Sequence, residues 1–181
     1  NFDYFVKNNF YYNGYVINTL LKSRQSIRLA IIWPSSLFQD EILSTLPDKV
    51  LISKIYPDNN LAHNVVVNAY LNEPWLGEYG TNYKGAWPKV AACFTEKREI
   101  YLVLFDLKDK SVNKLKENIR GLANVGKHSI HITDTPSETI EKANIFFCSN
   151  FEKWAKFARL NNGRKFIRKM ESLKKALESE R

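Results

Sequence analysis

Short hydrophobic runs alternate with amphipathic segments along most of the chain. Four runs are rich in β-branched and aliphatic residues, as strands covered on both faces are. Each is followed by a segment in which hydrophobic residues recur at helical spacing, as in Val112, Leu115 and Ile119. The predicted strands are IRLAIIW (27–33), KVLISKIY (49–56), REIYLVLFDL (98–107) and SIHIT (129–133). The predicted helices span residues 35–46, residues from 59 or 60 onward, 111–120 and 135–148.

This fourfold alternation predicts an α/β fold, with a mostly parallel sheet of about four strands flanked by helices. Local signals support the helix ends. Ser35 or Ser36 is expected to cap the first helix, and Gly121 to end the third. Thr135 and Glu138 stand three residues apart, which is the spacing of a capping box at the start of the last helix.

Residues 72–94, NEPWLGEYGTNYKGAWPKVAACF, lie outside this alternation. Their glycines, prolines and aromatic residues predict a long loop, and a loop of this length in a compact domain is usually functional. Its aromatic rings, Trp87 among them, could stack on a base or sugar while Lys84 or Lys89 meets phosphate. Alternatively, Trp75 and Trp87 anchor the loop against the core.

The C-terminal segment carries most of the net charge. Residues 151–181 contain ten lysine and arginine residues and four glutamates, which accounts for +6 of the total of +8. Phe166, Met170, Leu173 and Leu177 fall at helical spacing among these charges. We therefore expect an α/β domain over residues 1–150 and a basic amphipathic helical extension over residues 151–181, which covers the domain, pairs with another chain or lies along an acidic partner.

Composition narrows the class of protein. With 181 residues and 44% hydrophobic residues, the chain can bury a sizeable core as one globular domain. Cys93 and Cys148 are too few for a disulfide framework, which favours the cytoplasm or another reducing intracellular compartment. No hydrophobic run reaches the length of a membrane span.

In a parallel sheet, ligands gather beyond the carboxyl ends of the strands, where helix amino termini favour anions. The loops WPSS, DLKDKS and TDTPSET are expected to share that rim. The last loop holds the strongest candidates, with His131 or Asp134 as an acid–base group and Thr133 as a polar ligand. The alternative is structural: His131 is a buried, hydrogen-bonded histidine, and Thr135 and Glu138 only cap a helix.

Other familiar chemistries find little support. His128 and His131 are three residues apart in a predicted strand, so they should point to opposite faces, and no metal site is predicted. Asp106 and Lys108 match the D-x-K spacing of some nucleases, but no upstream acidic partner can be assigned. The sequence has no G-x-S-x-G elbow, P-loop or G-x-G-x-x-G motif, which disfavours the common hydrolases, kinases and dehydrogenases that carry them.

Residues 114–143 resemble a pattern in the amino-terminal α/β modules of sugar- or nucleotidyl-transferase-like proteins of microbes and phages. That pattern is K-x-x-I-R, a short spacer and H-S-x-H-I-x-D-T-x-x-E-T. The family's pattern continues into a D-x-D segment, whereas this chain continues into a basic segment. The matching residues here are Lys116, Ile119, Arg120, His128, Ser129, His131, Ile132, Asp134, Thr135, Glu138 and Thr139.

The resemblance and the residues together predict a transferase-like domain that binds a phosphorylated ligand, such as a nucleotide or nucleotide-sugar, at the strand carboxyl ends. Arg120 and Lys127 would neutralise phosphate, with His128, Thr133, Thr135 and Glu138 nearby and His131 or Asp134 as the catalytic group. The cofactor stays open. The alternative is a non-enzymatic protein that binds nucleic acid or a ribonucleoprotein assembly through its basic carboxyl-terminal segment.

Overall fold

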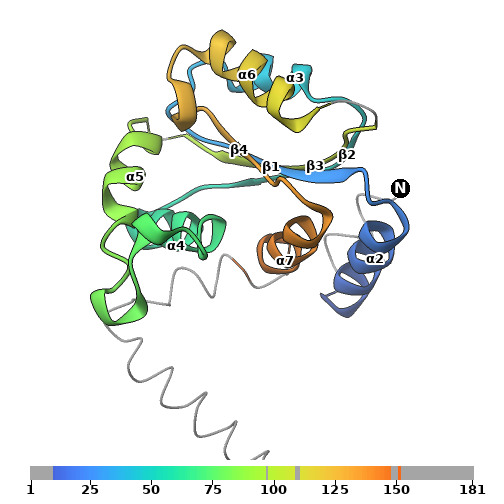
Figure 1. The fold of residues 1–181 in the computed structure, drawn as a ribbon, viewed down its shortest axis with the longest axis horizontal. Helices are drawn as coiled ribbons and strands as arrows, with labels where there is room; N and C mark the ends of the chain where they lie inside the picture. The colour runs from blue at the N-terminus through green and yellow to red at the C-terminus, as the bar shows by residue number, and fades with distance from the viewer. Residues whose placement is uncertain (1–9, 97, 109–110, 148–150, 152–181) are drawn as a thin grey trace, which may run out of the picture.

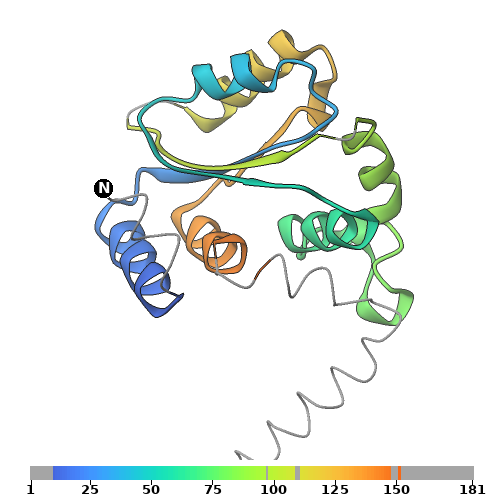
Figure 2. The same ribbon diagram turned by 180° about the vertical axis from the view of Figure 1, so that it is seen from behind.

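The protein folds into a four-stranded sheet with helices on both faces. The structure, a computed structural model, describes residues 10–96, 98–108, 111–147 and 151. Helices α3 and α6 cover one face, and α2, α4 and α7 cover the other, while α5 lies beside one edge (Figure 1). The view from behind shows the same two helical layers (Figure 2).

The elements follow one another in a regular order. The described strands are β1 (Ile27–Ile32), β2 (Lys49–Ile55), β3 (Ile100–Asp106) and β4 (Ile130–Ile132). The α-helices are α2 (Phe10–Ser23), α3 (Gln39–Thr45), α4 (Asn59–Ala69), α5 (Ala86–Cys93), α6 (Val112–Ala123) and α7 (Pro136–Phe146). The 3-10 helices are η1 (Pro74–Leu76), η2 (Tyr79–Thr81) and η3 (Gly126–His128).

The prediction of a mostly parallel sheet is wrong. The strand order is β2-β3-β1-β4, and all three neighbouring pairs are antiparallel. Strands β1 and β2, which α3 connects, run in the same direction, and so do β3 and β4, which α6 connects. In the sheet, however, β3 lies between β1 and β2, and β1 lies between β3 and β4. The result is two interleaved split β-α-β units. The alternation of strands and helices carries no information about which strand is inserted within each unit, or that β2 and β3, which α4 and α5 connect, are antiparallel neighbours.

This topology separates the three loops that were expected to share a rim. The loops after β3 and β4 leave the sheet at one end, and the WPSS loop after β1 leaves it at the other. There, Ser35 Oγ donates a hydrogen bond to the His128 carbonyl over 2.6 Å. The expected common binding rim at the carboxyl ends of four parallel strands therefore does not exist.

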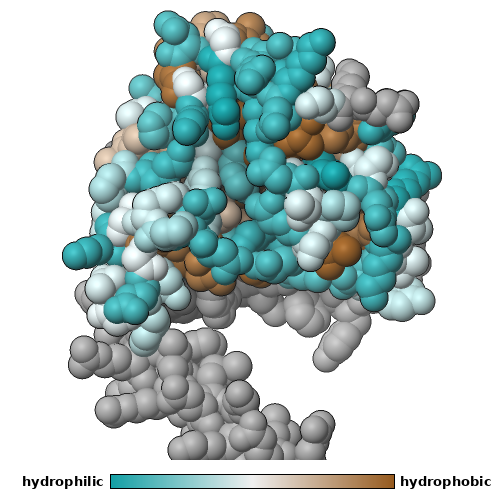
Figure 3. Space-filling view, viewed as in Figure 1, coloured by the Kyte–Doolittle hydropathy of each residue, from teal (hydrophilic) through white to brown (hydrophobic). Residues whose placement is uncertain are grey.

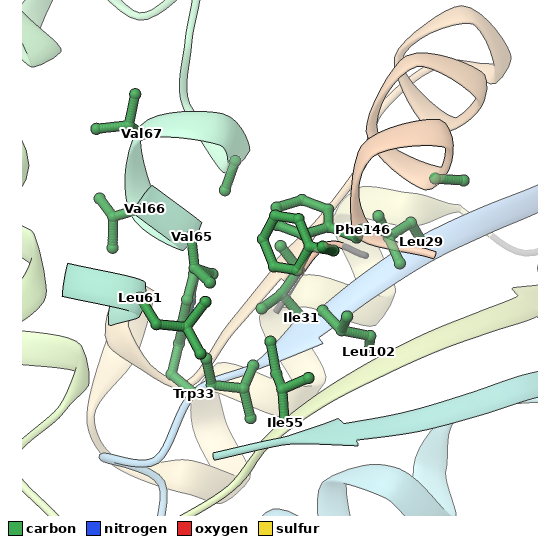
Figure 4. Close-up of a cluster of buried hydrophobic side chains, with 14 of the residues drawn as sticks. Leu29, Ile31, Trp33, Ile55, Leu61, Val65, Val66, Val67, Leu102 and Phe146 are labelled. Carbon is green, nitrogen blue, oxygen red and sulfur yellow. The ribbon is translucent and has the colours of Figure 1, made fainter. Parts of the chain in front are cut away.

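The sheet separates two hydrophobic clusters. One face of β1 and β3 contributes Leu29, Ile31 and Leu102, which pack against side chains of α4 and α7 (Figure 4). The opposite face places Ala30, Ile32 and their neighbours against α3 and α6. Because consecutive side chains of a strand point to opposite faces, the continuous hydrophobic runs in β1 and β3 supply both clusters.

Several element boundaries differ from the sequence prediction. Helix α3 begins at Gln39, after Phe38, and neither Ser35 nor Ser36 caps it. Gly121 lies inside α6, which ends instead at Asn124 in the left-handed conformation. Asparagine tolerates that conformation, because its short polar side chain can bond locally.

The segment expected to be a long loop contains α5 and two 3-10 helices, and helix α2 had no counterpart in the prediction. In α5, Ala86, Val90 and Cys93 recur at helical spacing, but neighbouring residues that are typical of turns, such as Gly85 and Pro88, make this pattern hard to recognise in the sequence. The predicted carboxyl-terminal helix and Cys148 lie outside the described residues. In the part of the chain that the structure describes, no helix has the length and hydrophobicity required to cross a membrane.

Candidate functional site: a basic pocket along the edge of β4

A pocket of about 490 Å³ lies along strand β4, at the edge of the sheet. All three residues of β4 line it, together with residues from α6, η3, α5 and the segment that follows α4. Its walls therefore come from both helical layers. The lining residues are Tyr70, Glu73, Trp75, Gly85, Pro88, Lys89, Lys116, Arg120, Lys127, His128, Ile130, His131, Ile132 and Asp134.

Helix α6 provides two cations to one wall. Lys116 and Arg120 are four residues apart, so they lie on the same side of the helix. Lys116 Nζ is 2.6 Å from Asp134 Oδ1, and its side chain is largely buried. Arg120 Nε is buried and has no hydrogen-bond partner among the described residues. One of these two cations is therefore neutralised by a carboxylate, and the other is not.

The opposite wall is aromatic. Tyr70 packs edge-on against His131, with ring centroids 4.8 Å apart, and against Trp75 at 5.1 Å. Lys89 Nζ lies 5.4 Å from the centroid of the Tyr70 ring, within the range of a cation–π contact. Trp75 is 45% exposed, which leaves part of its indole free to stack on a ligand at the mouth of the pocket.

Lys89 and His128 meet at the amino end of β4. Lys89 Nζ donates a hydrogen bond to the Lys127 carbonyl over 2.8 Å and lies 3.4 Å from His128 Nδ1. Burial, followed by the charge of Lys89, lowers the pKa of His128, so this imidazole is neutral at pH 7. Cys93 Sγ is 3.9 Å from the same ring nitrogen, but burial raises the pKa of its thiol to about 11. Cys93 is therefore a protonated, buried residue and a poor nucleophile.

His131 faces a carboxylate. Its Nε2 lies 3.6 Å from Glu138 Oε1, and Glu138 Oε2 accepts a 2.7 Å hydrogen bond from the Asp134 amide. Burial acts to raise the pKa of Glu138, but its contacts with His131 and with the Asp134 amide outweigh burial and lower it, so Glu138 is ionised at pH 7. His131 Nε2 is buried and has no hydrogen-bond partner among the described residues, so protonation of the imidazole would give this nitrogen an ion pair with Glu138.

The backbone of β4 adds two donors. Thr133 N donates to Leu29 O over 3.0 Å, and His131 is paired with Ile31. Hydrogen-bonded residues alternate along an antiparallel pair, so the peptide groups of Ile130 and Ile132 point away from β1 and toward the pocket. Amide groups directed at a site in this way can bind the oxygens of an anion.

The structure brings five of the sequence-predicted site residues together and leaves five outside the pocket lining. Those that line the pocket are His131, Asp134, Arg120, Lys127 and His128. Those that do not are Thr133, Thr135, Glu138, Lys84 and Trp87.

The threonines and Glu138 have structural roles. Thr133 is fully buried, and its Oγ1 accepts from the Leu29 amide and bonds Thr139 Oγ1 at 2.7 Å. Thr135 is the N-cap of α7 and accepts from the Glu138 amide at 3.1 Å. The carboxylate of Glu138 reaches back one residue further than a capping box requires, because it accepts from Asp134 and not from Thr135.

Lys84 and Trp87 do not reach the pocket, and the side chain of Lys84 is exposed. Trp87 is 46% exposed and packs over the buried His63, with ring centroids 4.3 Å apart. Burial lowers the pKa of His63, so it is a neutral partner for the indole. Trp87 thus fits the anchoring alternative, whereas Trp75 faces the pocket.

Sequence reasoning missed Tyr70 and Glu73. It offered Lys89 only as one of two lysines that could meet phosphate, and it gave Lys116 no binding role beyond its place in the motif. Lys116 stood four residues before Arg120, and this helical spacing was the available signal. Tyr70 and Glu73 lie between α4 and η1 and reach the pocket only through the packing of that segment, for which the sequence offers no local signal.

The face of the molecule drawn in Figure 3 is largely hydrophilic, with hydrophobic residues in separate patches. Among the described residues, no group of three or more histidine, cysteine and carboxylate side chains is placed to hold a metal ion. No protein-family model matches the sequence, and no curated protein matches it.

Proposed function

We propose that the β4-edge pocket binds a phosphorylated small molecule, such as a nucleotide or nucleotide-sugar, and that the domain is transferase-like. One observation carries the proposal: α5, α6 and η3 each direct a cation to the same pocket. Lys89, Arg120 and Lys127 form no ion pair with a carboxylate among the described residues. A phosphate group would supply the missing negative charge and accept charge-assisted hydrogen bonds.

The remaining features of the pocket suit the same kind of ligand. Trp75 offers a flat surface for a base or sugar ring, and the outward peptide groups of Ile130 and Ile132 offer donors for phosphate oxygens. His131, which faces the carboxylate of Glu138, is the acid–base candidate. Asp134 is engaged by Lys116, so its role is to balance charge and position that lysine, in place of the catalytic role expected from the sequence.

The proposal is tested by thermal-shift and calorimetric binding of nucleoside triphosphates, a uridine diphosphate sugar and inorganic phosphate to the full chain. A ligand present at 100 times its dissociation constant should stabilise the protein by about 2.7 kcal/mol. The double variant Arg120→Gln, Lys127→Gln should lose this stabilisation while it retains the wild-type circular dichroism spectrum.

Lys114→Gln is the matched control, because Lys114 is exposed on α6 but does not line the pocket. It removes one positive charge from the same helix and should leave binding unchanged. If the double variant and the control behave alike, or if no phosphorylated compound stabilises the wild-type protein, the proposal is wrong. Loss of turnover with intact binding in His131→Gln would assign the acid–base role.

A second candidate function is nucleic-acid binding through the carboxyl-terminal segment. The charge of +6 over residues 151–181 favours it, because cations that displace counterions from a phosphate backbone give salt-dependent affinity. Deletion of residues 161–181 should abolish binding to RNA or DNA if this segment is responsible. Small-ligand binding by the β4-edge pocket should survive the same deletion.

We also infer a reducing compartment, such as the cytoplasm. The support is that Cys93 is a free, buried cysteine. Mass spectrometry of the protein from its native source, with thiols alkylated before and after reduction, would test this. A disulfide at either Cys93 or Cys148 would contradict it.

A further inference from the structure

We propose that Lys89 is a nucleophilic amine that forms an imine with a phosphorylated aldehyde or ketone bound in the β4-edge pocket. The inference rests on the proposed phosphate-binding pocket and adds a reactive group to it. It does not depend on the ligand being a nucleotide.

The geometry around Lys89 separates it from an ordinary surface lysine. Its side chain is partly buried in the pocket wall, and its Nζ is held between the Lys127 carbonyl at 2.8 Å and His128 Nδ1 at 3.4 Å. The Tyr70 ring lies beneath it, with the centroid 5.4 Å away. The amine is therefore held in one place by three neighbours, and in the described part of the chain none of them is a carboxylate that would keep it charged.

The surroundings also favour the unprotonated amine. Burial is the largest influence and lowers the pKa of Lys89. Cys93 acts in the opposite direction, and the charges of Arg120 and Lys127 lower the pKa further. Desolvation and neighbouring cations are the two means by which lysines become nucleophilic near neutral pH.

His128 is placed to orient the amine. Burial, followed by the charge of Lys89, lowers its pKa and keeps it neutral, so with the ring proton on Nε2 its Nδ1 accepts a hydrogen bond from Lys89 while the ammonium proton is released to solvent. The free amine then attacks the carbonyl carbon and forms a C–N bond. The carbonyl oxygen takes up the two amine protons in succession and leaves as water, so that the products are an imine and one water molecule, without an oxidant or reductant.

The other cations define the class of carbonyl compound. Arg120 and Lys127 line the same pocket and meet no carboxylate among the described residues, so they can hold a phosphate while Lys89 reacts with the carbonyl group. An aldehyde without a phosphate group cannot form ion pairs with Arg120 and Lys127. The expected substrates are therefore small phosphorylated aldehydes and ketones.

Pyridoxal 5′-phosphate, a phosphorylated aldehyde, is a direct probe. The full chain is incubated with it at neutral pH, reduced with sodium borohydride and analysed by peptide mass spectrometry. Lys89 should be the main labelled lysine, and excess inorganic phosphate should suppress the label. Pyridoxal, which lacks the phosphate, should label Lys89 several-fold more slowly.

Lys89→Arg keeps the positive charge and should lose the label, whereas Lys114→Arg should retain it. If Lys89→Arg fails to fold, phosphate protection and the comparison with pyridoxal in the wild-type protein still decide the question. Label spread over exposed lysines, or located at Lys116 or Lys127, would overturn the inference. Phosphate or nucleotide binding without any imine at Lys89 would overturn it and leave the proposed function intact. Equal labelling by both aldehydes, without protection by phosphate, would count against both proposals.

Discussion

Strands β3 and β4 run in the same direction, and each ends in a polar loop that leads to a capped helix, but only β4 contributes residues to the pocket described above. Strand β3 lies between β2 and β1, and its first six residues are buried. At the start of the loop after it, Asp106 accepts a 3.0 Å hydrogen bond from the Lys108 amide. Strand β4 has a neighbour on one side only and carries His131 beside the aromatic wall.

The difference shows that position in the sheet matters more here than the polar residues that follow a strand. Both edges of β3 are occupied by other strands, so side chains and peptide groups along it cannot reach a ligand. The open edge of β4 lets α6 and the segment after α4 form two walls of a pocket around it. The following predictions test this contrast between a buried central strand and an edge strand that lines the proposed binding pocket.

The largest expected effect is a loss of stability from a substitution in β3. Leu102 is fully buried in the cluster shared with α4 and α7, so Leu102→Ala should destabilise the protein by about 2–5 kcal/mol. Urea unfolding followed by circular dichroism would measure this. Ile52→Ala on the edge strand β2, where the side chain is 39% exposed, should cost much less. Equal losses would contradict the assigned core.

The next effect is in the β4-edge pocket. Arg120→Gln should weaken binding of a phosphorylated ligand by about 1.5–3 kcal/mol, because a hydrogen bond to a charged group is lost. That corresponds to roughly tenfold or more in the dissociation constant, measured by titration calorimetry. Stability without ligand should change little. A variant that is less stable without ligand but binds the ligand normally would give Arg120 a structural role instead.

The N-caps of α6 and α7, the helices that follow β3 and β4, can be compared with a matched pair of variants. Thr135 caps α7 with a 3.1 Å hydrogen bond, and Ser111 caps α6 with a longer one of 3.5 Å. Thr135→Ala should cost about 1 kcal/mol of stability. Ser111→Ala should cost less, and thermal unfolding of both variants would show the order. The opposite order would mean that tertiary contacts of α6 depend on its cap.

A substitution of Asp134 should have a smaller effect on ligand affinity, and in the opposite direction. Asp134→Asn removes the counterion of Lys116 and leaves a fourth cation for the ligand. Affinity for phosphate compounds should rise, by no more than about 1 kcal/mol because the carboxylate is largely exposed. Calorimetry beside the wild-type protein would measure the gain. Weaker binding would indicate that Asp134 contacts the ligand directly.

The smallest effect is on the pH dependence of stability. Burial lowers the pKa of both His63 and His128 in the folded state. Their contribution to stability is complete above the unfolded-state pKa near 6.5 and is lost as the pH falls toward the lower folded-state pKa. His63→Leu should flatten this acid-side decline more than His128→Leu, because His63 is fully enclosed. Thermal unfolding of both variants between pH 5 and 8 would measure this difference. If the two variants flattened the decline equally, burial would not be its cause.

Much of the secondary structure could be read from local patterns. The four strands occupy the predicted hydrophobic runs, and Thr135 caps the last helix as its spacing with Glu138 and Pro136 indicated. Helix α5 was not predicted, because Gly85 and Pro88 are typical of turns and α5 begins between them. Five candidate site residues were identified from charge and position in the motif, although the reason for their proximity was not the one expected.

The sequence by itself determined most of the segments that become strands and helices, because hydrophobic periodicity and capping depend on near neighbours in the chain. Only the tertiary structure decided that β1 lies between β3 and β4, and therefore that every neighbouring pair is antiparallel and β4 is an edge. It also decided that Tyr70 and Lys89 face Arg120 across that edge. Strand order and pocket walls depend on packing between segments far apart in the chain, and local hydrophobic periodicity carries no record of it.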